Sequence, residues 1–429
     1  MLKRLRWTMV FMLFMAGVIS YLDRAALSVA APLLTKDLNL DPAELGIVFS
    51  SFFVGYSLFC FVGGHMSDKY GPKKVLLVAM LVWSVFCMLT AGVAGILSLL
   101  VVRVVFGMGE GPYATCTNKI IYQWFPAEKR TSAIGMANAG QQVGGAIAGP
   151  LVGLIALTWG WRVPFVAIGI LGILWLIIWR WSAADSPNQH PLLVEESENP
   201  KRSHHHGIEK DVAVLSLGQY LRRPTVLATS FAFFAYAYVL YFFLSWFPSY
   251  LTMERHMSLA DMSWANIIPW VFGAAGIMLG GIVCDALFRK MRRGILAHKT
   301  VIFVSLAISA CCVALAGQAY SVATAIALMS GAAFFTNLTL STYWGIISET
   351  VEPARLGGVG GFMHLVANTA GIIAPTLTGV LVKITNTFQI AFYISGGVAL
   401  LGALAVAIFV TDQSHKMTWL KGTSAKEPS

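Results

Sequence analysis

The chain has 429 residues, of which 57% are hydrophobic and 12% charged, and its mean hydropathy is +0.70. A soluble globular protein carries roughly 25% charged residues, so this composition excludes a cytosolic enzyme and a disordered chain. The net charge of +10 comes from 30 basic and 20 acidic residues, and the positions of these charges decide what the excess means. The six cysteines lie in apolar stretches without paired spacing, which is typical of packing residues and not of disulfides or metal ligands.

Long apolar runs follow one another along the chain. A helix that crosses a hydrocarbon core of about 30 Å needs about 20 mostly apolar residues. Twelve such runs occur, at about 7–33, 45–66, 75–94, 97–121, 131–157, 163–183, 225–251, 262–288, 299–318, 322–348, 357–382 and 387–411. We therefore predict an all-α transmembrane protein with twelve helices, because each backbone polar group in lipid must be satisfied within its own segment.

The basic residues lie mainly in alternate loops. If both termini are on one side, that side holds 22 of the 30 basic residues, and the other side holds four. Lys and Arg mark cytoplasmic loops, so we predict cytoplasmic N- and C-termini in a bacterial inner membrane. The charge excess is then an orientation signal, and we expect no nucleic-acid partner.

A polar segment at about 185–223 separates two groups of six spans. We predict an N-terminal six-helix bundle at 1–184, a cytoplasmic linker at 185–223, and a C-terminal six-helix bundle with a short cytoplasmic tail at 224–429. The linker contains the adjacent histidines His204–His206 without a Cys or carboxylate ligand pattern beside them, so we expect a solvated linker and no metal site.

The two halves repeat each other. Gly64 is followed by Asp68 in the first half, and Gly281 is followed at the same spacing by Asp285 in the second. Arg130 has a Gly at +5 and a Pro at +20, and Arg355 has the same residues at the same offsets. An internal duplication around a central site is typical of secondary transporters.

Five charged residues lie well inside predicted spans: Asp23 and Arg24 in span 1, and Arg103, Glu110 and Lys119 in span 4, of which Lys119 is close enough to the cytoplasmic end to snorkel. Such charges are costly and mark function by default; a set of structural ion pairs is the alternative. On a helix, Tyr21 and Arg24 share a face and Asp23 is turned about 100° away. Arg103 and Glu110 share a face about 10 Å apart, so they should not pair but can face one cavity.

This set of charges indicates anion capture with proton coupling. A guanidinium binds a carboxylate bidentately and stays protonated, so Arg24 suits an anchor for an acidic substrate. A low-dielectric cavity favours the protonated form of a carboxyl group, so Asp23 and Glu110 suit proton carriers. The chain has no Gly-x4-Gly-Lys-Ser/Thr loop. We therefore expect no cofactor, with the proton gradient as the energy source.

The loop sequence GHMSDKYGPKK at 64–74 resembles the loop motif of the major facilitator superfamily, and the six-plus-six arrangement extends the resemblance over essentially the whole chain. Two further motifs, Tyr21-x-Asp23-Arg24 in span 1 and Arg103-x6-Glu110-x-Pro112 in span 4, resemble those of the anion:cation symporter family. This family includes proton-coupled transporters of sugar acids and other organic anions.

The resemblance implies roles for individual residues. The substrate-binding residues would be Arg24, Tyr21, Tyr56, Gln141, Ser341, Tyr343 and Trp344. Asp23 and Glu110 would carry protons, with Arg103 tuning Glu110. The gate at the cytoplasmic face would consist of Asp68, Lys73, Lys74, Arg130 and Asp285. Span 11 has His364 where sugar-acid carriers often have Asn, with Asn368 one turn on; we count both among the substrate-binding residues.

We therefore predict a monomeric secondary transporter that imports a small organic anion by proton symport through alternating access, the anion being a hexonate, hexuronate or aldarate. The run Gly145-x3-Gly149-Pro150-x2-Gly153 in span 5 resembles a signature of drug exporters. A proton-coupled drug or metabolite exporter is thus the main alternative. An organic-phosphate antiporter and a non-transporting membrane sensor are the others, and sodium is the alternative coupling ion.

Overall fold

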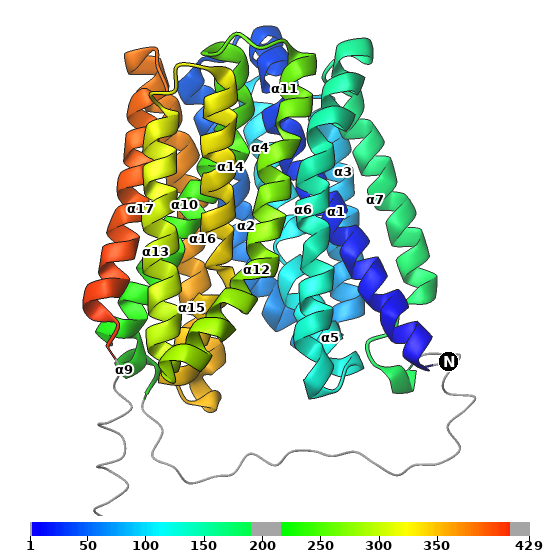
Figure 1. Ribbon diagram of the computed structural model, residues 1–429. Coiled ribbons are helices and arrows are strands. Elements are labelled where there is room, and N and C mark those ends of the chain that lie inside the picture. The colour runs from blue at the N-terminus through cyan, green and yellow to red at the C-terminus, as the bar shows by residue number, and fades with distance from the viewer. Residues whose placement is uncertain (1, 190–215, 412–429) are drawn as a thin grey trace, which may run out of the picture.

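The computed structural model describes residues 2–189 and 216–411. This part of the chain forms the 12 predicted spans (Figure 1). The first half consists of α1 (Leu2–Leu38), α2 (Pro42–Tyr70), α3 (Pro72–Thr90), the pair α4 (Ile96–Glu110) and α5 (Tyr113–Trp124), α6 (Ala127–Trp159) and α7 (Val163–Ser182). The second half consists of α10 (Pro224–Met253), the pair α11 (Leu259–Ala265) and α12 (Ile267–Met291), α13 (Gly294–Ala316), the pair α14 (Val322–Leu338) and α15 (Leu340–Thr350), α16 (Pro353–Thr385) and α17 (Gln389–Phe409).

The predicted linker contributes two short helical segments, η1 (Pro187–Gln189) and α9 (Leu217–Leu221). His204–His206 lie outside the described residues. The predicted all-α transmembrane fold is confirmed, including the short break between spans 9 and 10.

Large apolar side chains cover the outside of the bundle. Leu97, Met278 and Ile282 are 74%, 76% and 61% exposed. A soluble monomer rarely exposes a large contiguous apolar surface, whereas on spans of this length such side chains face hydrocarbon. The protein is a multi-pass membrane protein.

Spans 4 and 10 are each broken into two helices, which the hydropathy pattern does not predict. α4 and α5 meet at Gly111 and Pro112, because Pro112 has no N–H with which to continue the helical ladder. α14 and α15 meet at Thr339, whose Oγ1 donates to the carbonyl oxygen of Thr336 at 2.7 Å and competes with the backbone there. The two breaks occupy corresponding spans of the two halves, as an internal duplication requires.

The described ends of α1 and α17 lie on the same side of the bundle, which we call the terminal face; the other side is the opposite face (Figure 1). The halves are joined near the opposite face, where α2 packs against α16, and α6 against α11 and α12. Ser50 Oγ donates to the carbonyl oxygen of Ile372 at 2.7 Å and accepts from Thr376 Oγ1 at 2.7 Å. Lys383 and Asp41 form an ion pair at 2.8 Å, and the hydrogen bond from Lys383 lowers the pKa of Asp41.

Toward the terminal face the two halves diverge. α5 packs against α2, α3 and α6 of its own half, and α15 against α12, α13 and α16 of the other. The terminal ends of α5 and α12 point apart (Figure 1). Every side-chain hydrogen bond that joins the halves within residues 2–189 and 216–411 involves Ser50 or Asp41. The halves are therefore closed on each other at the opposite face and apart at the terminal face.

The glycine run of α6, at 145–153, lies where the two halves contact each other near the opposite face. Gly149 lies against the backbone carbonyl of Ser263 in α11, and Gly145 against the ring of Trp270 in α12; a Cβ at either glycine would collide. Close helix packing therefore accounts for the run that resembles an exporter signature.

Replacing Gly149 with valine should weaken closure at the opposite face, because the new side chain presses on the backbone of Ser263. Overpacking costs about 1–3 kcal/mol, so we expect the conformational equilibrium to shift by roughly 5- to 150-fold toward opening there. A membrane-impermeant thiol reagent should label a Thr376→Cys variant faster in this background. Gly135→Val is the matched control, since a Cβ at Gly135 meets nothing within 4 Å. Equal labelling in the Gly149→Val and control backgrounds would contradict the assignment.

Candidate functional site

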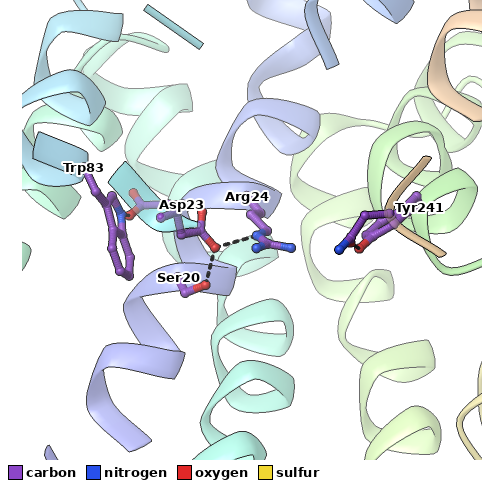
Figure 2. A network of polar contacts seen from close by, with 7 residues as sticks. Ser20, Asp23, Arg24, Trp83 and Tyr241 are labelled. Atoms are coloured by element: carbon purple, nitrogen blue, oxygen red, sulfur yellow. Dashed lines mark hydrogen bonds and ion pairs between the residues drawn. The ribbon is translucent and has the colours of Figure 1, made fainter. Parts of the chain in front are cut away.

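At the centre of the first half, α1 and α4 bring together an arginine and a glutamate that are far apart in the sequence. Arg24 Nε donates to Glu110 Oε1 at 2.6 Å, and Ser20 Oγ donates to the same oxygen at 2.5 Å (Figure 2). Arg24 is 7% exposed and Glu110 is fully buried. The second carboxylate oxygen, Glu110 Oε2, is buried without a hydrogen-bond partner in the described part of the chain. The ion pair therefore leaves one oxygen of Glu110 available for a proton.

Small residues position Glu110. Gly107 of α4 lies against the carbonyl of Phe52 in α2, and Gly55 of α2 lies against the carbonyl of Val104 in α4. The two backbones are in contact, as is common where glycines meet between membrane helices. Glu110 is the last residue of α4, where the helix carries partial negative charge, so the Arg24 guanidinium is what compensates the ionised carboxylate.

Aromatic rings surround the guanidinium of Arg24. Its central carbon lies 4.4 Å from the ring centroid of Tyr56, 4.9 Å from that of Phe52 and 5.2 Å from that of Tyr21. Such cation–π contacts are worth about 2 kcal/mol when the cation is desolvated. They fix the position of the guanidinium without using its N–H donors. The predicted neighbours Tyr21 and Tyr56 therefore lie beside Arg24.

Asp23 lies on a different side of α1 from Arg24, as the helix rotation predicts. Its carboxylate accepts a hydrogen bond from the indole of Trp83 (Figure 2). It accepts a second one from the thiol of Cys87 at 2.9 Å, and both donors belong to α3. The two buried acids thus have different surroundings: Glu110 faces a guanidinium, and Asp23 faces neutral donors.

The second half presents neutral polar groups toward Arg24. The guanidinium points toward Tyr241 of α10 (Figure 2). Tyr241 donates to Asn368 Oδ1 of α16 at 3.1 Å, and its ring packs on Phe53 of the first half, with the centroids 4.3 Å apart. Asn368, a predicted site residue, is therefore connected to the side of the site that Arg24 points toward, by its hydrogen bond with Tyr241.

The other predicted residues of the second half lie on α15 and α16. Tyr343 is buried and shares a hydrogen bond of 2.9 Å with Thr339. Trp344 is partly exposed, and its ring lies 5.6 Å from that of His364, which is also exposed. Ser341 is exposed as well. Neither Ser341 nor Gln141 of α6 has a side-chain hydrogen bond to the Arg24 group among the described residues, so their roles stay predictions.

The predicted gate residues do not join the two halves in this conformation. Asp68 pairs with Lys119 of its own half at 2.5 Å. Arg130 Nε donates to the carbonyl oxygen of Phe125 at 3.0 Å, and its guanidinium lies over the ring of Tyr122. The remaining gate residues, which have no side-chain ion pair within the described ranges, are Lys73, Lys74 and Asp285. Their gating role stays a prediction for a conformation that is closed at the terminal face.

Sequence reasoning missed Ser20, Trp83 and Cys87. Ser20 precedes Arg24 by one helical turn, so the i,i+4 spacing carries a signal for it. Trp83 and Cys87 follow the apolar pattern of α3 and carry no signal of their own. Their role depends on the packing of α3 against Asp23.

The chain matches a known protein family and resembles several relatives over nearly its whole length. The Major Facilitator Superfamily model matches residues 13–343. The chain belongs to the major facilitator superfamily. A hexuronate transporter of Bacillus subtilis (strain 168) is 45% identical to this facilitator, over 98% of this chain and 97% of the relative. A probable galactarate/D-glucarate transporter of the same strain is 31% identical, over 94% and 92%.

The solved structures agree on the fold of this facilitator. A bacterial homologue of the human lysosomal transporter Spinster superposes with a TM-score of 0.75 and 19% identity, covering 99% of both chains. As a member of this superfamily, the protein is a membrane transporter and not an enzyme. The predicted family is confirmed.

Proposed function

We propose that this facilitator imports a sugar acid together with protons, across a bacterial inner membrane, with both termini in the cytoplasm. The observation that carries the proposal is the buried ion pair between Arg24 and Glu110 in the middle of two membrane spans. Ionisable groups inside spans usually mark the path of the substrate or the coupling ion. The relatives that transport hexuronate and galactarate or glucarate support a sugar acid as the substrate.

The proposed coupling of proton and substrate depends on competition between Glu110 and the substrate carboxylate for the guanidinium of Arg24. While Glu110 is ionised, it occupies Arg24 Nε. A proton on Glu110 removes the negative charge and leaves the guanidinium without a counter-ion. An uncompensated buried charge costs several kcal/mol, so the protonated carrier favours a carboxylate from the substrate at Arg24. Proton and anion therefore bind together, and each makes binding of the other more favourable.

Neutral hydrogen-bond donors and acceptors from the second half would form hydrogen bonds with the hydroxyl groups of the sugar acid. Tyr241 faces Arg24 across the site, and Asn368 accepts the hydrogen bond of Tyr241. A hydroxyl group both donates and accepts, as Tyr and Asn side chains can in return. The charge would thus be bound by the first half and the polyol chain by both halves. A cation or an amphipathic drug would leave Arg24 uncompensated, which argues against the exporter alternative.

The conformation supports alternating access with the terminal face toward the cytoplasm. In that orientation the carrier is closed to the outside through the contacts of Ser50 and Asp41 with α16. Opening to the outside would break these contacts and bring the halves together at the terminal face. The charged gate around Asp68 would then act there.

A ligand panel tests the proposed function. A ligand that binds only the folded protein stabilises it by about 2.7 kcal/mol at one hundred times its Kd. We expect D-glucuronate, D-galacturonate and D-galactonate to raise the melting temperature of the purified protein, and neutral glucose to leave it unchanged. Stabilisation by lipophilic cations alone would support the exporter alternative and contradict the proposal.

A further inference from the structure

Arg103 of α4 is a buried cation that forms no ion pair with another described residue. It is 4% exposed, and its Nε has no hydrogen-bond partner in the described part of the chain. Its guanidinium carbon lies 5.1 Å from the ring centroid of Phe52 and 5.0 Å from that of Phe106. The rings make cation–π contacts with the guanidinium. They do not accept hydrogen bonds from its N–H groups, which point outward in the plane of the guanidinium. Since buried charges in proteins are normally paired, the free Nε–H of Arg103 is available to an anionic group that no described side chain supplies by direct contact.

Arg103 opens into a small cavity that Arg24 also lines. The other lining residues are Phe49, Phe52 and Phe53 of α2 and Leu244 and Ser245 of α10, and Ser245 is 5% exposed. The cavity volume is about 10 Å³, which is the room that about one water molecule needs. Because the walls come from both halves, separating the halves at the opposite face would widen the cavity.

The charges around this cavity balance only when both acids are ionised. Asp23 and Glu110 then offset Arg24 and Arg103. If Asp23 carries a proton as well as Glu110 in the loaded carrier, two guanidinium charges remain. A substrate with one carboxylate offsets one of them, and a substrate with two carboxylates offsets both.

We propose that Arg103 and Ser245 form a second anion subsite beside Arg24, which binds the second carboxylate of a dicarboxylate sugar acid of the aldarate class. This inference rests on the proposed function, because it takes Arg24 as the anchor of the first carboxylate. It adds a residue that separates aldarates from hexuronates, which have a single carboxylate.

The geometry permits one molecule to reach both arginines. Both guanidinium carbons lie within about 5 Å of the Phe52 centroid, so they are no more than about 10 Å apart. The carboxyl carbons of an extended six-carbon diacid are about 6 Å apart, given C–C bonds of about 1.5 Å. Hydrogen bonds of about 2.8 Å at each end add enough reach to contact both groups.

Isothermal titration of the purified full-length protein with D-glucarate and D-glucuronate tests the subsite. Glucuronate is mainly a closed pyranose ring in solution and glucarate is an open chain, so D-gluconate, an open-chain acid with one carboxylate, is titrated beside them to separate the effect of the second carboxylate from that of the ring. We expect the wild type to bind glucarate at least about tenfold more tightly than glucuronate, because glucarate makes a second charge-assisted contact. Arg103→Gln should bring the ratio of the two affinities close to one, and Arg103→Lys should retain part of the preference.

Ser245→Ala provides a second variant that leaves all four charges in place. It should lower the glucarate-to-glucuronate ratio by a few fold. A wild-type ratio near one, or the same ratio in wild type, Arg103→Gln and Ser245→Ala, would overturn the subsite. Failure of both acids to bind the wild type would instead overturn the proposed function.

Discussion

Replacing Arg24 with lysine should weaken hexuronate binding by about 100-fold or more, with a matching loss of uptake at low substrate concentration. Arg24 has a planar fork of donors that stays charged, and three aromatic rings hold it in place. A lysine ammonium is a point charge that cannot bind a carboxylate bidentately. It would also pair with Glu110 in a different position. Titration of the purified variant with D-glucuronate measures the effect.

The matched control is Arg180→Lys, the same exchange at an exposed position near the terminal end of α7. We expect this control to bind and transport as the wild type does. Undiminished binding in Arg24→Lys would show that Arg24 is not the anchor, and the site would have to be sought elsewhere in the bundle.

Replacing Glu110 with glutamine should abolish accumulation of substrate against its gradient and preserve exchange of internal for external substrate. Glutamine has nearly the shape of a protonated glutamate and can still accept from Ser20 and Arg24 at its oxygen. It cannot release a proton, so the carrier stays in the form that binds the anion. Proteoliposomes with an imposed pH gradient measure accumulation, and preloaded proteoliposomes measure exchange.

Glu44→Gln is the control for the loss of an acid. Glu44 forms a capping box with Asp41 at the start of α2, where glutamine serves as well as glutamate. This variant should accumulate substrate normally. Gradient-driven accumulation in Glu110→Gln would remove Glu110 from the coupling mechanism.

The sequence predicts features that depend on a single segment. Span length and hydropathy define the twelve helices, and the helix rotation alone places Tyr21 beside Arg24 and turns Asp23 away. The breaks in spans 4 and 10 escape a hydropathy window, because Pro112 and Thr339 do not interrupt an apolar run. Their causes are local, the missing N–H of Pro112 and the hydrogen bond of Thr339 to the backbone of Thr336.

The sequence also does not predict which side chains of distant segments pair with each other. Glu110 is separated from Arg24 by 86 positions, and nothing in either span identifies the partner. The sequence places Arg103 and Glu110 on one face of span 4 and predicts that they do not pair directly. In the structure Glu110 forms its ion pair with Arg24. The contact of Tyr241 with Asn368 depends likewise on how α10 and α16 pack.

The central claim is that the substrate carboxylate replaces Glu110 at Arg24 when Glu110 takes up a proton. Proton uptake on binding tests this most directly. D-glucuronate at the same pH is added to purified protein in a weakly buffered solution, and the change in pH is recorded. The account predicts that binding takes up protons in proportion to the anion bound, and that Glu110→Gln binds with less uptake. Binding by the wild type without any proton uptake near neutral pH would contradict it.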